Sequence, residues 1–417
     1  MGNTVELKKP VRRFPVRIFN YVAERLPSID ERLAIDADSL MARACQFTRL
    51  QNFGERSFVE AFEILVDDIN GNAQLNRFGR FAWKGMLHTL LCNRLYMEEK
   101  LRLEPAIAKR QIASPIFVLG FPRTGSTFLH TLLACDPAAR YLSAAESMRA
   151  QGDPRRRPLP GTLQRLNARW GFALLDYLAP GFKTIHAEPV DGPAECGGLL
   201  LHSFATAAFL PSLNVPQYAQ WLKTLDYGPT ARYHRHQLCV LDALHSGSHW
   251  VLKSPAHLPM IDALIKTYPD ARFVFLHRDA VKVVASFCSL VGLTRGIYSD
   301  ALDGSQIGQQ TADTLGDLLR RALDARQRHD PRRFVDVQYA DLVADPLGAV
   351  SGIYRQFGWT MPPAMEARVR NRVETTRNGL HTRHRYELTQ FGLSRQRVQE
   401  QFDWYSKAFE IPEEKTG

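Results

Sequence analysis

The stretch that decides the fold is residues 115–129, PIFVLGFPRTGSTFL. Its apolar beginning, Ile116 to Leu119, is typical of a short strand that is buried on both faces. A loop bracketed by Gly120 and Gly125 follows, and an amphipathic helix continues through Leu133. In such a turn the backbone N–H groups converge on an anion, and the helix N-terminus adds its positive end. The stretch predicts a phosphate-binding loop, although an ordinary strand-to-helix turn has the same pattern when it is taken alone.

Three further apolar runs lie downstream, each followed by polar or helical sequence: residues 250–252, 272–276 and 334–337. Short apolar runs that alternate with helices predict an α/β fold, in which a doubly wound parallel sheet is covered by helices on both faces. Ligands of such sheets bind at the carboxyl ends of the strands. We therefore expect the chemistry just after Leu119, Leu252 and Leu276.

The sequence before this region has a helical pattern. Phe58, Phe62, Leu65 and Ile69 recur at the spacing of one helix face. We predict a helical N-terminal extension over residues 1–112 and an α/β domain with a helical C-terminal segment over residues 113–417. A chain of 417 residues, 45% of them hydrophobic, forms a large core, which excludes a disordered protein, a collagen-like fibre and a small disulfide scaffold.

The chain carries a formal net charge of +10, with 53 basic and 43 acidic residues mixed along it. Such an excess attracts anions in general, whether nucleic acid, a membrane surface or a small polyphosphate. The densest basic clusters are residues 155–157 and the arginines at positions 368, 370 and 372. Solvated helix or loop faces explain both clusters as well as a binding role does.

The cysteines indicate a reduced, cytoplasmic protein. They are widely spaced, without a C-x-x-C pair or a neighbouring histidine at zinc spacing, so we expect neither a structural zinc site nor disulfides. The N-terminus lacks the pattern of a secretory signal, and the longest apolar stretch is shorter than the about 20 residues of a membrane span. The basic segment from Lys8 to Arg17, with apolar residues between its charges, favours peripheral membrane contact. The six cysteines are Cys45, Cys92, Cys135, Cys196, Cys239 and Cys288.

The loop differs from a nucleotide-hydrolysing P-loop at one position. Ser126 stands where the Walker lysine belongs, and the cation is instead Arg123, inside the loop. Phosphoryl transfer normally uses that lysine with magnesium, whereas a less charged sulfuryl group can rely on side-chain cations. The loop resembles the Pro-Lys-Ser-Gly-Thr-Thr-Trp loop of sulfotransferases that use 3′-phosphoadenosine 5′-phosphosulfate (PAPS). This resemblance implies a P-loop-like loop that binds the phosphosulfate through Pro122, Arg123, Thr124, Gly125, Ser126, Thr127 and Phe128.

The run at residues 272–276 leads into His277, Arg278 and Asp279, and Asp279 is placed to cap the next helix. A guanidinium at a strand end suits bidentate phosphate binding. Sulfotransferases have an arginine here and a serine eight residues later, and both hold the 3′-phosphate of the donor. By this resemblance, Arg278 and Ser286 hold it in this chain.

The run at residues 250–252 is followed by Lys253-Ser-Pro-Ala-His257-Leu, which resembles the bacterial and carbohydrate-type branch of the family. The resemblance implies that Lys253 contacts the donor. It also makes His257 a candidate base, although Pro255 and Ala256 alter the spacing. Alternatively, His257 orients the neighbouring backbone.

Sulfuryl transfer to an alcohol needs a base to remove the hydroxyl proton. His186, in a His-x-x-Pro segment that resembles one in this branch, is the first choice, because a histidine pKa near neutrality suits the task. Glu188, Glu195 and Glu146 are rival carboxylates, each of which could instead be a capping or surface residue. Residues 199–210, LLLHSFATAAFL, could line an acceptor pocket or simply belong to the core.

The resemblance spans about residues 113–410, including Tyr339-Ala-Asp-Leu after the last main strand and, faintly, Arg377-Asn-Gly near the end. It implies a PAPS-dependent sulfotransferase that acts on a small-molecule or lipid alcohol without a metal. The alternatives are a kinase or NTPase of related fold, which would need magnesium and a Walker lysine, and a non-enzymatic anion-binding protein. No nucleic-acid motif is recognisable, so we expect no nucleic-acid partner, and the sequence indicates no particular oligomeric state.

Overall fold

The computed structural model describes residues 14–26, 28–147, 153–155, 192–379 and 387–414, with scattered positions between 166 and 177. The described residues before the first strand form helices joined by short loops. Long amphipathic helices in this part bury one face each, for example through Phe62 and Leu65. These helices are α1 (Phe14–Ala23), α2 (Ile29–Leu33), α3 (Ala37–Thr48), α4 (Phe58–Asn72), α5 (Arg77–Leu103) and α6 (Pro105–Ala108).

A parallel sheet of five strands forms the centre of the molecule, in the order β2-β3-β1-β4-β5. The four predicted runs lie in β1, β3, β4 and β5, which confirms the α/β fold. The sequence analysis missed β2, because it has only three residues and no apolar run. The strands are β1 (Ile116–Gly120), β2 (Ala139–Tyr141), β3 (His249–Lys253), β4 (Arg272–His277) and β5 (Phe334–Gln338).

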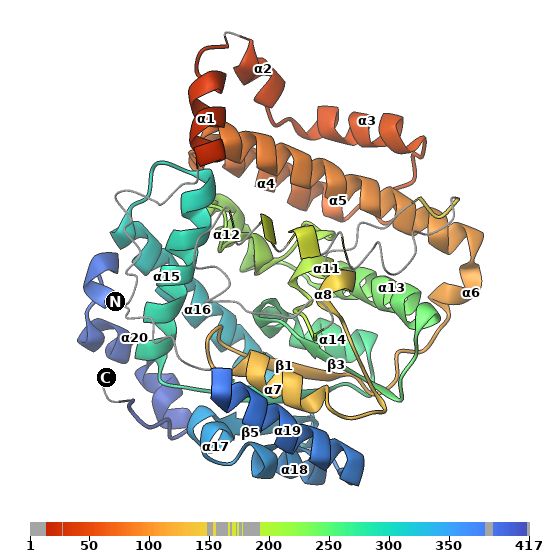
Figure 1. Ribbon diagram of the computed structural model, residues 1–417, viewed down its shortest axis with the longest axis vertical. Helices are drawn as coiled ribbons and strands as arrows, with labels where there is room; N and C mark the ends of the chain where they lie inside the picture. The colour runs from red at the N-terminus through yellow and green to blue at the C-terminus, as the bar shows by residue number, and fades with distance from the viewer. Residues whose placement is uncertain are drawn as a thin grey trace.

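Helices cover both faces of the sheet (Figure 1). Alternate side chains of a strand point to opposite faces. Phe117 therefore belongs to the buried cluster that includes α4, α5, α11 and α13, whereas Val118 belongs to the cluster that includes α7, α18 and α19. The helices after β1 are α7 (Ser126–Leu133), α8 (Ala144–Ser147), α11 (Gly197–Leu201), α12 (Pro216–Leu222), α13 (Gly228–Leu244), α14 (Ile261–Thr267), α15 (Ala280–Tyr298), α16 (Gly304–Gln327), α17 (Tyr339–Ala344), α18 (Pro346–Gln356), α19 (Pro363–Gly379) and α20 (Arg395–Ala408). Short 3₁₀ helices are η1 (Ala207–Phe209), η2 (Pro255–Met260), η3 (Pro331–Arg333) and η4 (Leu388–Phe391).

The N-terminal helices share one hydrophobic core with the sheet. Phe62 and Leu65 of α4 and Leu91 of α5 belong to the same buried cluster as Phe117 and Phe273 of the strands. The helical character of residues 14–108 agrees with the sequence analysis, but a domain boundary at residue 112 stays a prediction, because packing is continuous across it.

One helix, α15, is long and apolar enough to cross a membrane by length and composition, but 72% of its apolar window is buried inside the fold. That burial is typical of a core helix. Its neighbours are α16 and α20, with which it forms a third hydrophobic cluster beside the sheet. The helix follows β4 directly, and its first turn therefore lies at the carboxyl end of the sheet.

Candidate active site

The loop after β1 adopts a backbone that needs its glycines. Gly120, Arg123 and Gly125 have φ angles of 139°, 71° and 86°, which favour glycine over other residues. A Cβ on Gly120 would lie 2.7 Å from the carbonyl oxygen of Leu276, and one on Gly125 would lie 3.0 Å from the ring of Tyr339. The loop is therefore drawn tightly against β4 and the end of β5, and Arg123 is held in the left-handed region that residues other than glycine rarely adopt.

The N-terminus of α7 meets the carboxyl end of β3 through Lys253. The buried Lys253 ammonium donates to the hydroxyl of Thr127 over 2.9 Å and forms an ion pair with Glu195. Its side chain is only 2% exposed, whereas Glu195 is 27% exposed and borders solvent. The structure thus brings Thr127 and Lys253, both predicted site residues, together with one of the rival carboxylates.

The carboxyl end of β4 joins the same loop from the other side. Arg123 Nε donates to Ser286 Oγ of α15 over 3.1 Å, and Arg278 Nη1 donates to the carbonyl oxygen of Arg123 over 2.7 Å. Asp279 caps α15 by accepting from the N–H of Val281. Three of the residues that the sequence analysis assigned to the donor therefore lie in direct contact, although they come from the loop after β1, the end of β4 and α15.

Arg278 has a carboxylate partner that the sequence analysis missed. Its Nε and Nη2 donate to the two carboxylate oxygens of Glu414, over 2.6 and 2.9 Å. Its guanidinium carbon also lies 3.9 Å from the centre of the Tyr339 ring. Burial disfavours the charge, but the hydrogen bond to Glu414 together with the charges of Tyr339, Glu414 and Asp279 outweighs it, and the pKa of Arg278 is raised. This two-pronged contact is the geometry in which a guanidinium also binds a phosphate.

Tyr339 and Glu414 differ in how well the sequence could have revealed them. Tyr339 directly follows β5, so the rule that ligands bind at strand ends points to it. Glu414 lies beyond α20, near the end of the chain, and its N–H donates to Asp279 over 3.0 Å. No local motif surrounds it, because the contact depends on how the last segment returns to the sheet.

His257 lies in the core and makes none of the loop's polar contacts. It is fully buried in η2, its ring meets Phe117 edge-on with 5.1 Å between ring centres, and burial lowers its pKa well below the usual range. Neither ring nitrogen has a hydrogen-bond partner among the described residues. Its role as a base stays a prediction, and nothing in its surroundings shows it orienting the backbone through a hydrogen bond.

The other candidate bases are distributed as follows. His186 and Glu188 lie outside the described residues. Glu146 accepts from the N–H and the hydroxyl of Ser143, each over 2.9 Å, and pairs with Arg140, which is a capping role. Of the rival carboxylates that the structure describes, Glu195 is the one in contact with Lys253.

The apolar segment 199–210 belongs largely to the core. Leu199, Leu200, Phe204 and Phe209 are at most 3% exposed and pack in the cluster that includes Phe117. The core interpretation that the sequence analysis left open therefore holds for these side chains, and they do not line an open acceptor pocket.

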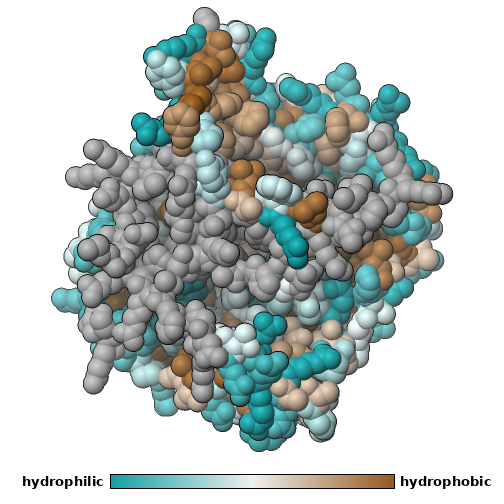
Figure 2. Space-filling view, in the orientation of Figure 1, coloured by the Kyte–Doolittle hydropathy of each residue, from teal (hydrophilic) through white to brown (hydrophobic). Residues whose placement is uncertain are grey.

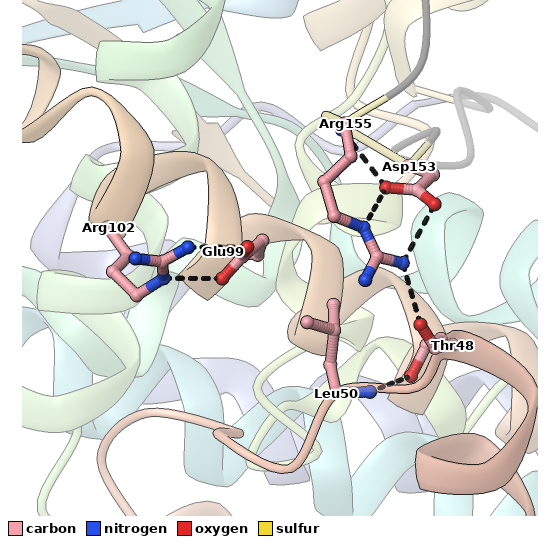
Figure 3. Close-up of polar contacts among 6 residues, drawn as sticks. All are labelled: Thr48, Leu50, Glu99, Arg102, Asp153 and Arg155. Atoms are coloured by element: carbon pink, nitrogen blue, oxygen red, sulfur yellow. Dashed lines mark hydrogen bonds and ion pairs between the residues drawn. The ribbon is translucent and has the colours of Figure 1, made fainter.

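One arginine in each basic cluster outside the loop pairs with a neighbouring protein group. Arg155 donates to Asp153 over 2.7 Å through Nε and to the carbonyl oxygen of Thr48 over 2.7 Å through Nη2 (Figure 3). In α19, Arg370 pairs with Glu366 one turn away. Arg155 thus fastens a connecting segment to α3. The side chains of Arg377, Asn378 and Gly379 lie outside the described residues.

Comparison with known proteins identifies the family. The model of the sulfotransferase family matches residues 115–363, which is more than half of the chain. The chain therefore belongs to the sulfotransferase family and is a sulfotransferase. This confirms the resemblance that the loop and the Arg278–Ser286 spacing indicated, and the matched region begins one residue before β1 and extends beyond α18.

Its relatives include mycobacterial enzymes. The omega-hydroxy-beta-dihydromenaquinone-9 sulfotransferase Stf3 of Mycobacterium tuberculosis is 25% identical over 62% of this chain and 67% of its own length. The crystal structure of sulfotransferase STF1 from Mycobacterium tuberculosis H37Rv is 33% identical, covers 88% of this chain and 98% of that one, and has a TM-score of 0.76. Sulfotransferase STF9 from Mycobacterium avium is 28% identical over 91% and 98% of the two chains, with a TM-score of 0.80.

Proposed function

We propose that this enzyme transfers a sulfuryl group from PAPS to the hydroxyl of an apolar small molecule or lipid. The observation that carries the proposal is the convergence of three cations from three strand ends, Arg123, Lys253 and Arg278, around the N-terminus of α7. A nucleotide with a phosphosulfate at one end and a 3′-phosphate at the other carries anions that suit such a set.

In this proposal the loop after β1 binds one end of the donor, and Arg278 with Ser286 of α15 binds the other end. Residues 122–128 hold the phosphosulfate with backbone N–H groups and the hydroxyls of Ser126 and Thr127. Arg278 and Ser286 hold the 3′-phosphate. Because the Glu414 carboxylate uses the same N–H groups of Arg278, the phosphate and Glu414 compete, and donor binding displaces or shifts the last segment of the chain.

The transfer step needs charge stabilisation on one side of the sulfur and proton removal on the other. The acceptor oxygen forms a bond to sulfur while the bond from sulfur to the bridging oxygen breaks, and adenosine 3′,5′-bisphosphate leaves with the electron pair. Arg123 and Lys253 stabilise the charge that develops on the leaving oxygen. Lys253 is anchored for this role by Thr127 and Glu195.

The proton of the acceptor hydroxyl goes to His186 in the first instance, with Glu195, which pairs with Lys253, as the alternative. We expect His186→Ala to abolish turnover and preserve donor binding, and the exposed His245→Ala to change neither. Retained activity in His186→Ala would move the role to Glu195, Glu188 or His257. Turnover lost in Glu195→Gln with His186 intact would single out Glu195 or its pairing with Lys253.

The acceptor class rests on a relative. Stf3 is named for a menaquinone-derived lipid alcohol, which supports an apolar acceptor here. Sulfated product from isotope-labelled PAPS, measured over a panel of lipid, polyketide-like and sugar alcohols in EDTA, tests the proposal. Transfer to an apolar alcohol supports it. Sulfation of sugars alone, or phosphoryl transfer from ATP that requires magnesium, would contradict it and would favour a carbohydrate enzyme or a kinase.

Contact with a membrane would bring such an acceptor within reach, and α1 supports it. Four apolar side chains of α1, namely Phe14, Ile18, Tyr21 and Val22, are 43–71% exposed, and Figure 2 shows hydrophobic residues gathered over this helix. We propose that the otherwise cytoplasmic protein binds anionic membranes through α1 and the preceding basic residues. Phe14→Ser should weaken flotation with anionic vesicles, whereas Phe47→Ser, at an equally exposed phenylalanine of α3, should not. Equal losses, or no flotation, would refute this contact.

A further inference from the structure

A second group of polar side chains is buried beside the active site. Cys196 directly precedes α11, His234 lies in α13 and His257 lies in η2. One ligand atom from each, the cysteine Sγ and one nitrogen of each ring, lies within 4.8 Å of the other two. Each side chain is at most 1% exposed. The three residues come from separate segments of the chain, and the fold alone brings them together.

Three of the four histidine ring nitrogens of this cluster lack a hydrogen-bond partner in the part of the chain that the structure describes. His257 Nδ1, His257 Nε2 and His234 Nε2 have no hydrogen-bond partner there. Buried polar groups are nearly always paired with protein, water or an ion. Unpartnered imidazole nitrogens that face a buried thiol are therefore an arrangement that a ligand would complete.

The surroundings orient one of the rings. His234 Nδ1 lies 2.8 Å from the hydroxyl of Tyr268. A hydrogen bond at one ring nitrogen leaves the other available in a fixed direction, and metal-binding histidines are held in this way. In this case the nitrogen that remains is the unpartnered Nε2. Phe117 packs against the ring of His257, with 5.1 Å between ring centres, and restricts its movement.

We propose that Cys196, His234 and His257 bind a zinc ion. One sulfur and two imidazole nitrogens suit zinc, whose bonds of about 2.0–2.3 Å place neighbouring ligand atoms roughly 3.3–3.6 Å apart. The observed separations, at most 4.8 Å, need only a small closing movement. The thiol loses its proton when the ion binds, because zinc binds the thiolate. A tetrahedral ion would keep one position for water or hydroxide.

The ion would fasten two segments that also serve the active site. Cys196 adjoins Glu195, the partner of Lys253, and its N–H donates to the carbonyl oxygen of Lys253 over 2.9 Å. His257 lies four residues after Lys253, in η2. Zinc would therefore link the Glu195 segment and the Lys253 segment from within the core, and the three ligands would act as positioning residues toward the reaction.

Metal content of the full-length protein tests the proposal. The protein, produced with zinc and dialysed against a mild chelator, should retain about one zinc ion per chain. Cys196→Ser and His257→Gln should lower zinc affinity by at least about 100-fold, and Tyr268→Phe by about 10-fold. The matched control Cys288→Ser, at a buried cysteine outside the cluster, should retain the ion.

A spectroscopic measurement on the unmodified chain keeps the test independent of how the variants fold. Protein refolded with Co²⁺ in place of zinc should show a thiolate-to-cobalt charge-transfer band, which Cys288→Ser preserves and added zinc removes. Substoichiometric zinc in the wild-type protein together with no such band would overturn the proposal. The proposal would also be overturned if Cys196→Ser and His257→Gln bound zinc as tightly as the wild-type protein, since the ion would then be held elsewhere.

Discussion

The loop of residues 122–128, proposed to bind the donor, and the Cys196–His234–His257 cluster both border β1, but they bury their polar groups in opposite ways. Around the loop, each predicted cation has a protein partner: Arg123 contacts Ser286, Lys253 contacts Glu195, and Arg278 contacts Glu414. In the cluster, three ring nitrogens have no partner among the described residues. A partnered cation can exchange its partner for a ligand and recover it afterwards, which suits a co-substrate that binds and leaves. Unpartnered nitrogens have no partner to return to, which suits an ion that stays.

Removal of the Lys253 ammonium should have the largest effect. We expect Lys253→Ala to lower kcat by about 10²–10³-fold, because a preorganised donor to the developing charge is lost. The exposed Lys266→Ala is the matched control and should leave kcat unchanged. Single-turnover rates with labelled PAPS measure the effect. A loss confined to KM would contradict this, because it would mean that Lys253 stabilises the ground state and the transition state equally.

Replacement of the unpartnered His257 ring by an apolar side chain tests whether the cluster, unlike the loop, depends on a bound ion. We expect His257→Leu to lower the thermal midpoint of zinc-loaded protein by about 3–6 °C, because the bound ion loses a ligand. In chelated protein the same change should leave the midpoint unchanged or raise it, because it removes buried polar atoms that lack partners. Scanning calorimetry with and without EDTA measures both. Equal destabilisation in the two conditions would contradict the contrast between the regions.

Ser286→Ala should have a smaller effect on the loop. The substitution removes the acceptor of Arg123 Nε and one proposed ligand of the 3′-phosphate, so donor affinity should fall by about 3–10-fold. Ser289→Ala, at a buried serine one turn further along α15, provides the control. Competition binding with adenosine 3′,5′-bisphosphate gives both values, and equal affinities would remove Ser286 from the donor site.

The smallest expected effect is a gain in donor affinity when Glu414 is replaced. Glu414→Gln weakens the bidentate contact with Arg278, so donor affinity should rise by about 2–10-fold because competition for the guanidinium falls. Glu413→Gln is the neighbouring control, since Glu413 lies near Arg395 instead. Weaker donor binding in Glu414→Gln would show that Glu414 supports the site instead of competing with the donor.

Local patterns predicted the sheet and most of the loop. Four strands, the glycines of the loop and the Arg278–Ser286 spacing could be found because each depends on neighbours in the sequence. β2 was missed because three partly buried residues carry no hydrophobic signal.

The features that the sequence did not predict depend on contacts between residues far apart in the chain. Glu414 reaches Arg278, and Cys196 reaches His234 and His257, only through the fold. For the same reason the absence of zinc spacing in the sequence led to the expectation of no metal, from which the proposed cluster departs. The core position of residues 199–210 was likewise one of two open interpretations, because an apolar run has the same composition in a core and in a pocket.

The most direct measurement is a calorimetric titration of the full-length protein with adenosine 3′,5′-bisphosphate in EDTA. The donor site described here predicts one-to-one binding at micromolar concentrations without magnesium, and a loss of affinity of about 10–100-fold in Arg278→Ala, because charge-assisted hydrogen bonds to the 3′-phosphate disappear. The exposed Arg320→Ala should bind as the wild-type protein does. No binding at tens of micromolar, or binding that Arg278→Ala leaves unchanged, would contradict the assignment of the donor site.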